Sequence, residues 1–268
     1  MTRCVCIGLA ASAVTAIYAR PQRDHSAAIH PIIDKDGELL GATRAGRWIP
    51  QDKAAHLLRG GETYRLYSAS SSMGIVRGGK PVSMDAPCPD QMTVSVKMPE
   101  KAIVGVNGSW DAMPRKARVE SASQPVYRAA VKKVLEENGI RNPDVRIDQI
   151  FRCDLDNDGA DEVLISAHRY SARDGNHDPH AGDYSFIMLR KLKAGRVTTS
   201  VVAGEFYPKH KTEVAPNTCR IDGFYDFMGD KKMQIVVGWQ YYEGSGSDVY
   251  TVRGDGRTDV VLSSACGA

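Results

Sequence analysis

The sequence has few aromatic residues, no cluster of positive charge and, after its first residues, no long hydrophobic run. Aromatic residues make up 7% of the 268, and the formal net charge is only +3. The basic residues are scattered, which argues against a nucleic-acid partner. No segment after Ala19 is long and apolar enough to cross a membrane as a helix. At this length, with 42% hydrophobic residues, the chain can bury the core of one large domain or two small ones.

Several common catalytic and cofactor motifs are also missing. The sequence contains no GxSxG nucleophile elbow, no HExxH helix and no glycine-rich loop that cradles phosphate. Its cysteines form no CxxC pair, which argues against a zinc site made of thiolates. These absences favour a non-catalytic protein over an enzyme.

The start of the chain, residues 1–19, reads MTRCVCIGLAASAVTAIYA and combines an early arginine, an apolar stretch and small residues before a polar segment. This pattern is typical of a secretory signal peptide, and cleavage after Ala16 or Ala19 would fit it. A buried N-terminal helix is the alternative. We therefore expect a secreted or periplasmic protein with no membrane span after cleavage. Residues 20–46 show little hydrophobic pattern and are expected to be flexible.

Four cysteines follow the predicted signal peptide, an even number in a compartment where disulfides form. Four cysteines allow three pairings, and the sequence alone does not choose among them. The favoured pairing joins Cys88 to Cys266, which would tie the C-terminal end back to the first half of the chain, and Cys153 to Cys219. The alternative is four unpaired, buried thiols.

The most informative segment is DLDNDGADE, residues 154–162, which places three aspartates at alternate positions and ends on a glutamate. Alternate residues of a tight turn can all point inward, and a glycine allows the sharp bend. Crowded carboxylates are costly without a cation, so a metal site is favoured over a solvated acidic turn. The loop predicts a Ca²⁺ site. Its ligands would be Asp154, Asp156, Asp158, the Ala160 carbonyl and Glu162.

Short segments rich in branched apolar residues predict eight strands in the second half of the chain. They fall into two sets of four, each predicted to form an antiparallel meander. The first set is 147–152, 163–168, 184–192 and 197–203, and the second is 221–225, 233–239, 248–253 and 258–263.

The two sets are related by a constant shift along the sequence, which indicates an internal repeat. The shift that carries Asp154 to Asp226 also carries Asp158 to Asp230. The second copy has lost the metal-binding pattern, because Met228 and Gln234 replace two of the ligands. It should therefore keep the turn without the ion.

Upstream of the repeats, residues 123–138 predict a helix with Pro125 in its first turn and one apolar face, which should pack on the first repeat. A shorter helical turn is predicted over 50–59. Strand-like stretches at 62–68, 92–98 and 102–107 predict a third, divergent sheet. The expected domains are thus a β-rich region at 47–120, followed by a helix and two repeats at 121–268.

The phrase FRCDLDNDGADEVLIS resembles the FG-GAP or VCBS repeat of integrin-like β-propeller proteins. The resemblance covers one repeat strongly and a second weakly, and it implies the same ligands as the loop itself. It also implies blade-like four-stranded meanders. Two recognisable blades cannot close a propeller ring. The predicted fold is therefore mainly β, a partial or irregular propeller with one or two short helices and sheets packed face to face.

Two other clusters are candidates for function. Tyr241, Tyr242 and Glu243 lie at a strand end, where aromatic rings beside a carboxylate suit a carbohydrate or peptide contact. Alternate tyrosines on opposite faces of a sheet edge are the simpler explanation. His177, Asp178 and His180 could together hold zinc, although an exposed turn is the favoured interpretation.

These features predict an exported, non-catalytic calcium-binding scaffold that presents loops to a protein or glycan partner. The alternative is a secreted hydrolase of cell-wall or extracellular polymer. Its site would lie where residues 241–247 and 177–180 converge.

Overall fold

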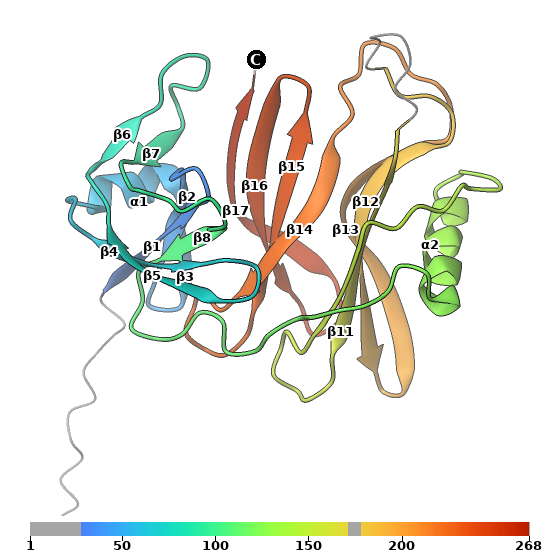
Figure 1. Ribbon diagram of the computed structural model, residues 1–268, viewed down its shortest axis with the longest axis horizontal. Coiled ribbons are helices and arrows are strands. Elements are labelled where there is room, and N and C mark those ends of the chain that lie inside the picture. Colours follow the sequence, from blue (N-terminus) through green and yellow to red (C-terminus); the bar gives the residue numbers. More distant parts are fainter. Residues whose placement is uncertain (1–27, 171–177, 268) are drawn as a thin grey trace, which may run out of the picture.

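A computed structural model describes residues 28–170 and 178–267, which form a stack of antiparallel sheets (Figure 1). Within these residues the protein is mainly β, with two short helices, and no sheet closes on itself. The prediction of a mainly β fold is confirmed. Among the described residues, no helix is long and apolar enough to span a membrane.

The first-repeat sheet contains the first predicted meander and one extra short strand, in the order β13-β12-β11-β10-β9. Every strand predicted for this repeat is present. Its strands are β9 (Arg118–Val119), β10 (Gln149–Cys153), β11 (Glu162–Arg169), β12 (Asp183–Lys193) and β13 (Arg196–Tyr207).

The second-repeat sheet has the order β14-β15-β16-β17, as the second meander predicts. Its third strand begins at Gly244, ahead of the predicted start at residue 248. The four strands are β14 (Thr218–Tyr225), β15 (Gln234–Tyr241), β16 (Gly244–Val252) and β17 (Thr258–Gly267).

The N-terminal sheet has the order β3-β2-β1-β8-β4-β5. The described part of the segment predicted to be flexible contributes its strands β1 and β2, so that prediction and the domain boundary at residue 47 are wrong. The sheet comprises β1 (Ile29–Asp34), β2 (Leu39–Arg44), β3 (Arg47–Pro50), β4 (Thr63–Tyr67), β5 (Ser72–Arg77) and β8 (Val104–Val106).

The physical reason is burial on both faces. Ile32, Ile33, Leu39 and Leu40 are all 0% exposed. A strand that is buried on both sides shows paired apolar residues rather than the alternation expected of a surface strand. The predicted strand at 92–98 also differs, because β7 (Met92–Val94) pairs with β6 (Pro81–Ser83) in a separate small sheet.

The two helices cover the ends of the stack. Helix α2 (Pro125–Glu137) packs against the outer face of the first-repeat sheet, as predicted, through Val131 and Leu135. Helix α1 (Gln51–Leu57) packs against the outer face of the N-terminal sheet through Ala54 and Ala55.

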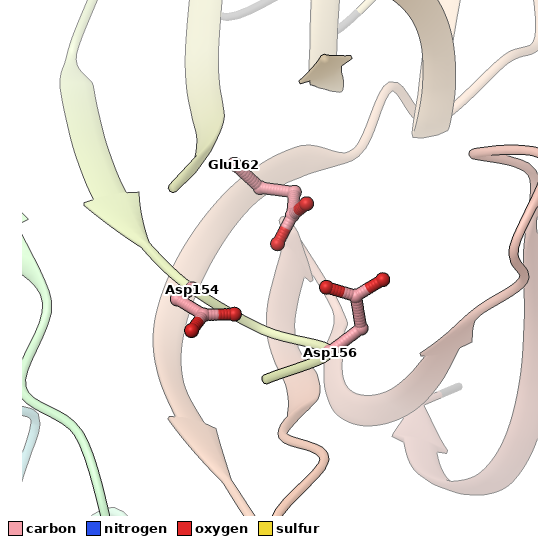
Figure 2. A group of neighbouring side chains, drawn as sticks. All are labelled: Asp154, Asp156 and Glu162. Carbon is pink, nitrogen blue, oxygen red and sulfur yellow. The ribbon is translucent and has the colours of Figure 1, made fainter. Parts of the chain in front are cut away.

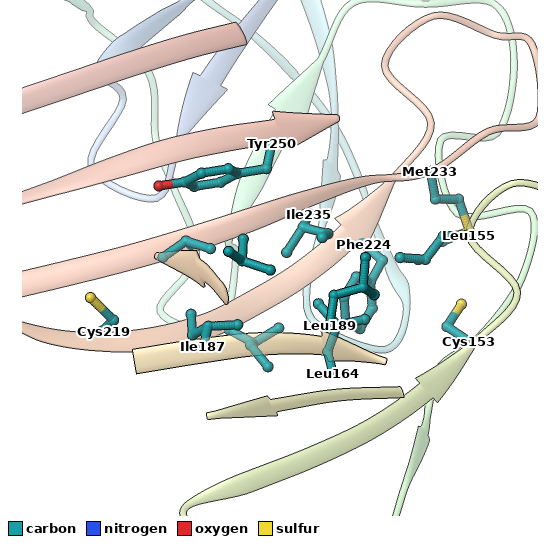
Figure 3. Packing of buried hydrophobic residues seen from close by; sticks show 13 residues of the cluster. Cys153, Leu155, Leu164, Ile187, Leu189, Cys219, Phe224, Met233, Ile235 and Tyr250 are labelled. Carbon is teal, nitrogen blue, oxygen red and sulfur yellow. The ribbon is translucent and has the colours of Figure 1, made fainter. Parts of the chain in front are cut away.

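Apolar side chains fill the spaces between successive layers. The cluster between the two repeat sheets includes Leu164, Ile187, Phe224 and Ile235 (Figure 3). A second cluster joins the second-repeat sheet to the N-terminal sheet and includes Val236. Leu164 and Val236 are counterparts in the two copies of the repeat, and each packs toward the next sheet of the stack. The repeat in the sequence is therefore also a repeat in packing.

The structure contains one of the two predicted disulfides. Cys88 and Cys266 are bonded, with their Cα atoms 5.6 Å apart. Cys153 and Cys219 are free and buried, so the second predicted pairing is wrong. The reason is their placement, because the two thiols lie toward opposite ends of the cluster between the repeat sheets (Figure 3).

Candidate metal centre

The loop between β10 and β11 folds around the carboxylate of Asp154. Cys153 and Glu162 are paired across its base. The Asp154 carboxylate accepts hydrogen bonds from the backbone N–H groups of Asp158 and Gly159, at 3.2 and 3.1 Å. Gly159 has a φ of +88°, which a residue without a Cβ adopts without strain. Asp154 therefore shapes the turn as well as facing its interior.

Three of the predicted ligands lie together. One carboxylate oxygen from each of Asp154, Asp156 and Glu162 lies within 4.8 Å of the others, and the cluster can hold a metal ion (Figure 2). Asp158 is not in this group. Its side chain is 46% exposed, and its Oδ1 accepts the N–H of Ala160 at 2.9 Å. Ligation by Asp158 and by the Ala160 carbonyl therefore stays a prediction.

A lysine from a neighbouring strand already lies among these carboxylates. Lys191 Nζ on β12 is 2.7 Å from Asp156 Oδ2 and 2.6 Å from Glu162 Oε1, and the lysine side chain is only 5% exposed. Burial opposes the charge on Lys191, but its hydrogen bonds to Asp156 and Glu162 outweigh burial and raise its pKa. Burial raises the pKa of Glu162, while its hydrogen bond from Lys191 acts in the opposite direction. In this state the loop holds an ammonium group.

The lysine does not neutralise the loop. Asp154, Asp156, Asp158 and Glu162 supply four negative charges when ionised. Lys191 supplies one positive charge, and Arg115 Nε, 3.9 Å from Asp154, supplies another, so two of the four negative charges remain. A fifth carboxylate, Asp161, is paired with arginines on the side facing β9. One divalent cation would balance the remaining charge.

Asp156 also has an oxygen without a partner. Its Oδ1 atom is buried and makes no hydrogen bond within the described part of the chain. A buried acceptor left unpaired costs about 1–3 kcal/mol. A cation beside this oxygen would remove that cost, so hard-cation chemistry fits the donor set.

The second-repeat loop, residues 226–234, reproduces the hydrogen bonds of the first. The Asp226 carboxylate accepts the N–H groups of Asp230 and Lys231, the counterparts of Asp158 and Gly159. Gln234 Oε1 accepts the N–H of Phe227 at 2.9 Å, as Glu162 accepts that of Leu155 at 2.8 Å. The predicted retention of the turn is confirmed. The side chain that closes it is the uncharged amide of Gln234.

One arginine contacts both loops. Arg115 donates from Nε to the carbonyl of Asp154, from Nη1 to Asn157 Oδ1 at 2.9 Å, and from Nη2 to the carbonyl of Lys231. Trp110 Nε1 donates to the carbonyl of Asp226 at 2.7 Å, the place that Arg115 takes in the first loop. The segment before β9 therefore holds the two loops in register.

The other predicted sites are arranged differently. Tyr241 ends β15, Tyr242 is 56% exposed in the following turn, and Glu243 is exposed beside it. His177 lies outside the described residues. His180 stacks on His210 with ring centroids 5.2 Å apart, and Asp178 accepts the N–H of Val214. The convergence that the hydrolase hypothesis requires stays untested.

Sequence reasoning missed Lys191 and Arg115, the two cations of the site. Lys191 is one of two lysines in LRKLK, and nothing local distinguishes it from Lys193, which is exposed. Arg115 lies in an irregular segment with no pattern of its own. Only the pairing of β11 with β12 brings Lys191 beside the loop.

Comparison of the chain with protein-family models, with curated proteins and with solved structures found no match. The fold and the loop define a class in physical terms, a mainly β protein of stacked antiparallel sheets with an acidic cluster that can hold a metal ion. The resemblance to the FG-GAP or VCBS repeat stays a prediction.

Proposed function

We propose that this protein is an exported, non-catalytic β-repeat protein of the FG-GAP or VCBS type, in which calcium bound at residues 154–162 stiffens a scaffold for a protein or glycan partner. Asp154, Asp156, Asp158 and Glu162 would hold the ion with the Ala160 carbonyl. Carboxylate and carbonyl oxygens in a flexible loop suit Ca²⁺ better than Mg²⁺, which requires tighter octahedral geometry.

The observation that carries the proposal is the uncompensated charge of the loop. Two negative charges remain after Lys191 and Arg115 are counted, and an oxygen of Asp156 has no partner among the described residues. Calcium would displace the Lys191 ammonium from Asp156 and Glu162, so that three negative charges would then face the ion. The ion would then fix the β10–β11 crossing, and its role is structural.

Export is supported by two features of the chain. Residues 1–19 have the pattern of a signal peptide. The Cys88–Cys266 disulfide suits an oxidising compartment, where such bonds persist.

Calcium titration followed by calorimetry tests the proposal. The wild-type protein should bind about one Ca²⁺ per chain, and Asp156→Asn should weaken binding strongly because it removes the negative charge of a central ligand. Asp230→Asn is the matched control in the second-repeat loop and should bind as the wild type does. A chelator should lower the melting temperature of the wild type and the control but not of Asp156→Asn, since a ligand stabilises only a state that binds it. Absence of calcium binding by the wild type would contradict the proposal.

A further inference from the structure

A pocket with both polar and apolar lining lies between the two repeat sheets. It has a volume of about 200 Å³. Glu205 of β13 lines one side, and Trp239 of β15 and Asp248 of β16 line the other. Asn217 and Cys219 form part of its wall at the start of β14. We call this site the inter-sheet pocket.

Beside the pocket, two aromatic rings make a flat surface on β15. Trp239 and Tyr241 have ring centroids 6.3 Å apart and ring planes only 17° from parallel. The separation is close to the distance between residues i and i+2 of a strand, about 6.6 Å, so the rings lie side by side on one face. Trp239 lines the inter-sheet pocket, and Tyr241 follows it two residues later on the same face of β15.

Glycines on the neighbouring strand make this arrangement possible. Gly246 and Gly244 are the cross-strand partners of Trp239 and Tyr241. A Cβ on Gly246 would lie 2.4 Å from the Trp239 ring, and one on Gly244 would lie 2.6 Å from the Tyr241 ring. Both contacts are too close for any other residue. The alternating glycines of GSGS therefore let the two rings lie flat against the sheet.

The polar groups of the inter-sheet pocket are mainly acceptors. The Glu205 carboxylate accepts the N–H and the side-chain amide of Asn217, at 3.1 and 3.0 Å. Asn217 Oδ1 is buried and has no hydrogen-bond partner within the described residues. The Asp248 carboxylate interacts with the Trp239 side chain, which helps to fix the indole ring. A ligand that fits this pocket should present several hydrogen-bond donors.

We propose that the inter-sheet pocket and the Trp239–Tyr241 surface bind an oligosaccharide. The apolar face of a sugar ring would stack on the aromatic surface, and hydroxyl groups would donate to Asn217, Glu205 and Asp248. The inference rests on the proposed function in that it names the partner of the scaffold.

Binding of purified protein to a panel of immobilised neutral and amino oligosaccharides of glucose, galactose, mannose and N-acetylglucosamine tests this assignment. The best member should then be titrated by calorimetry. Tyr241→Ser should weaken binding about tenfold or more, the scale on which loss of a stacking residue acts. Asp248→Asn, which keeps the side-chain shape, should also weaken it. Gln240→Ala is the matched control, because Gln240 lies next to Tyr241 on the opposite face of β15 and is exposed.

The outcomes separate this inference from the calcium proposal. Failure of the wild type to bind any oligosaccharide would overturn it, as would binding that Gln240→Ala weakens and Tyr241→Ser does not. Folding of each variant is checked by its unfolding midpoint, and Trp239→Phe supplies a second variant that keeps an aromatic ring and should retain part of the affinity. Sugar binding that persists in a protein shown to bind no calcium would support the site while contradicting the proposed role of the ion. Cleavage of the bound oligosaccharide would support the site and contradict the non-catalytic function.

Discussion

The loops at 154–162 and 226–234 share their backbone hydrogen bonds and differ in charge. In both, an aspartate at the first position accepts N–H groups from the far side of the turn. In both, a side-chain oxygen at the last position accepts an N–H near the start. Only the first loop adds Asp156 and a charged Glu162. The shape of the turn therefore depends on its first and last residues. The middle residues decide whether the loop can bind a cation.

The strongest test of this comparison is removal of the Lys191 ammonium group from the first loop. Lys191→Met leaves Glu162, whose side chain is 2% exposed, without its positive partner. Loss of one member of a buried ion pair costs about 3–5 kcal/mol, so the metal-free protein should be destabilised by this amount. Urea unfolding in the presence of a chelator measures it, and calcium should restore part of the loss.

The second loop suggests the control for Lys191→Met. β-Sheet register places Thr251 where the first repeat has Lys191, since Arg190 pairs with Val163 and Tyr250 with Ile235. A loop with Lys191→Met and Glu162→Gln together would resemble the second loop, which closes on Gln234. The double variant should be more stable in chelator than Lys191→Met alone. Equal stability of the two would show that the buried charge of Glu162 is not the cause.

A third turn, after Asp34, also begins with an aspartate whose carboxylate accepts backbone N–H groups. It extends the comparison to a buried carboxylate. Asp34 Oδ1 accepts the N–H groups of Asp36 and Glu38, both at 2.9 Å, and the residue is 3% exposed at the end of β1. Burial, with the neighbouring charge of Glu38, raises the pKa of Asp34 from 3.8 to about 7. Protonated Asp34 is therefore favoured by folding.

This raised pKa predicts a pH dependence of stability. The contribution of Asp34 is fully present below about pH 4 and is lost as pH rises through about 7, a difference on the order of 4 kcal/mol. Asp34→Asn keeps the acceptor and removes the titration. The wild type should lose more stability than Asp34→Asn between pH 4 and pH 8 in urea unfolding. Parallel curves for the two proteins would be inconsistent with a buried, protonated Asp34.

The arginine shared by the two loops gives a smaller effect. Arg115→Ala removes donors to the carbonyls of Asp154 and Lys231 and to Asn157, and should cost about 2 kcal/mol in urea unfolding. Arg118→Ala is the control, because its side chain is 65% exposed and exposed pairs contribute about 0–1 kcal/mol. Equal effects of the two substitutions would mean that Arg115 does not hold the loops together.

The smallest expected effects come from substitutions at the position where each loop has a residue with positive φ. Gly159 and Lys231 are counterparts, with φ of +88° and +68°. Lys231→Gly should stabilise the protein by about 1 kcal/mol, because it relieves a left-handed residue with a side chain. Gly159→Ala should destabilise it by a similar amount, and no atom of the described residues lies within 4 Å of the added Cβ to complicate the result. Thermal unfolding of the pair should shift in opposite directions.

The sequence predicts the repeats well because their strands and turns are encoded locally. Alternating branched residues give all eight strands, and the aspartates and Gly159 give the loop. The strands β1 and β2 escape the same reasoning, because burial on both faces removes the alternating pattern. Lys191 and the inter-sheet pocket depend on the register between strands distant in the sequence. A strand pattern does not specify that register.

The Cys88–Cys266 disulfide has a consequence for the whole chain. It joins the small β6–β7 sheet to the last strand, β17, across a sequence separation of 178. The sheets form an open row, but the polypeptide from Cys88 to Cys266 is a covalent ring. A single proteolytic cut in any loop of that ring would leave both pieces attached. A single cut within this ring therefore does not separate one sheet from the sheets that follow it in the chain.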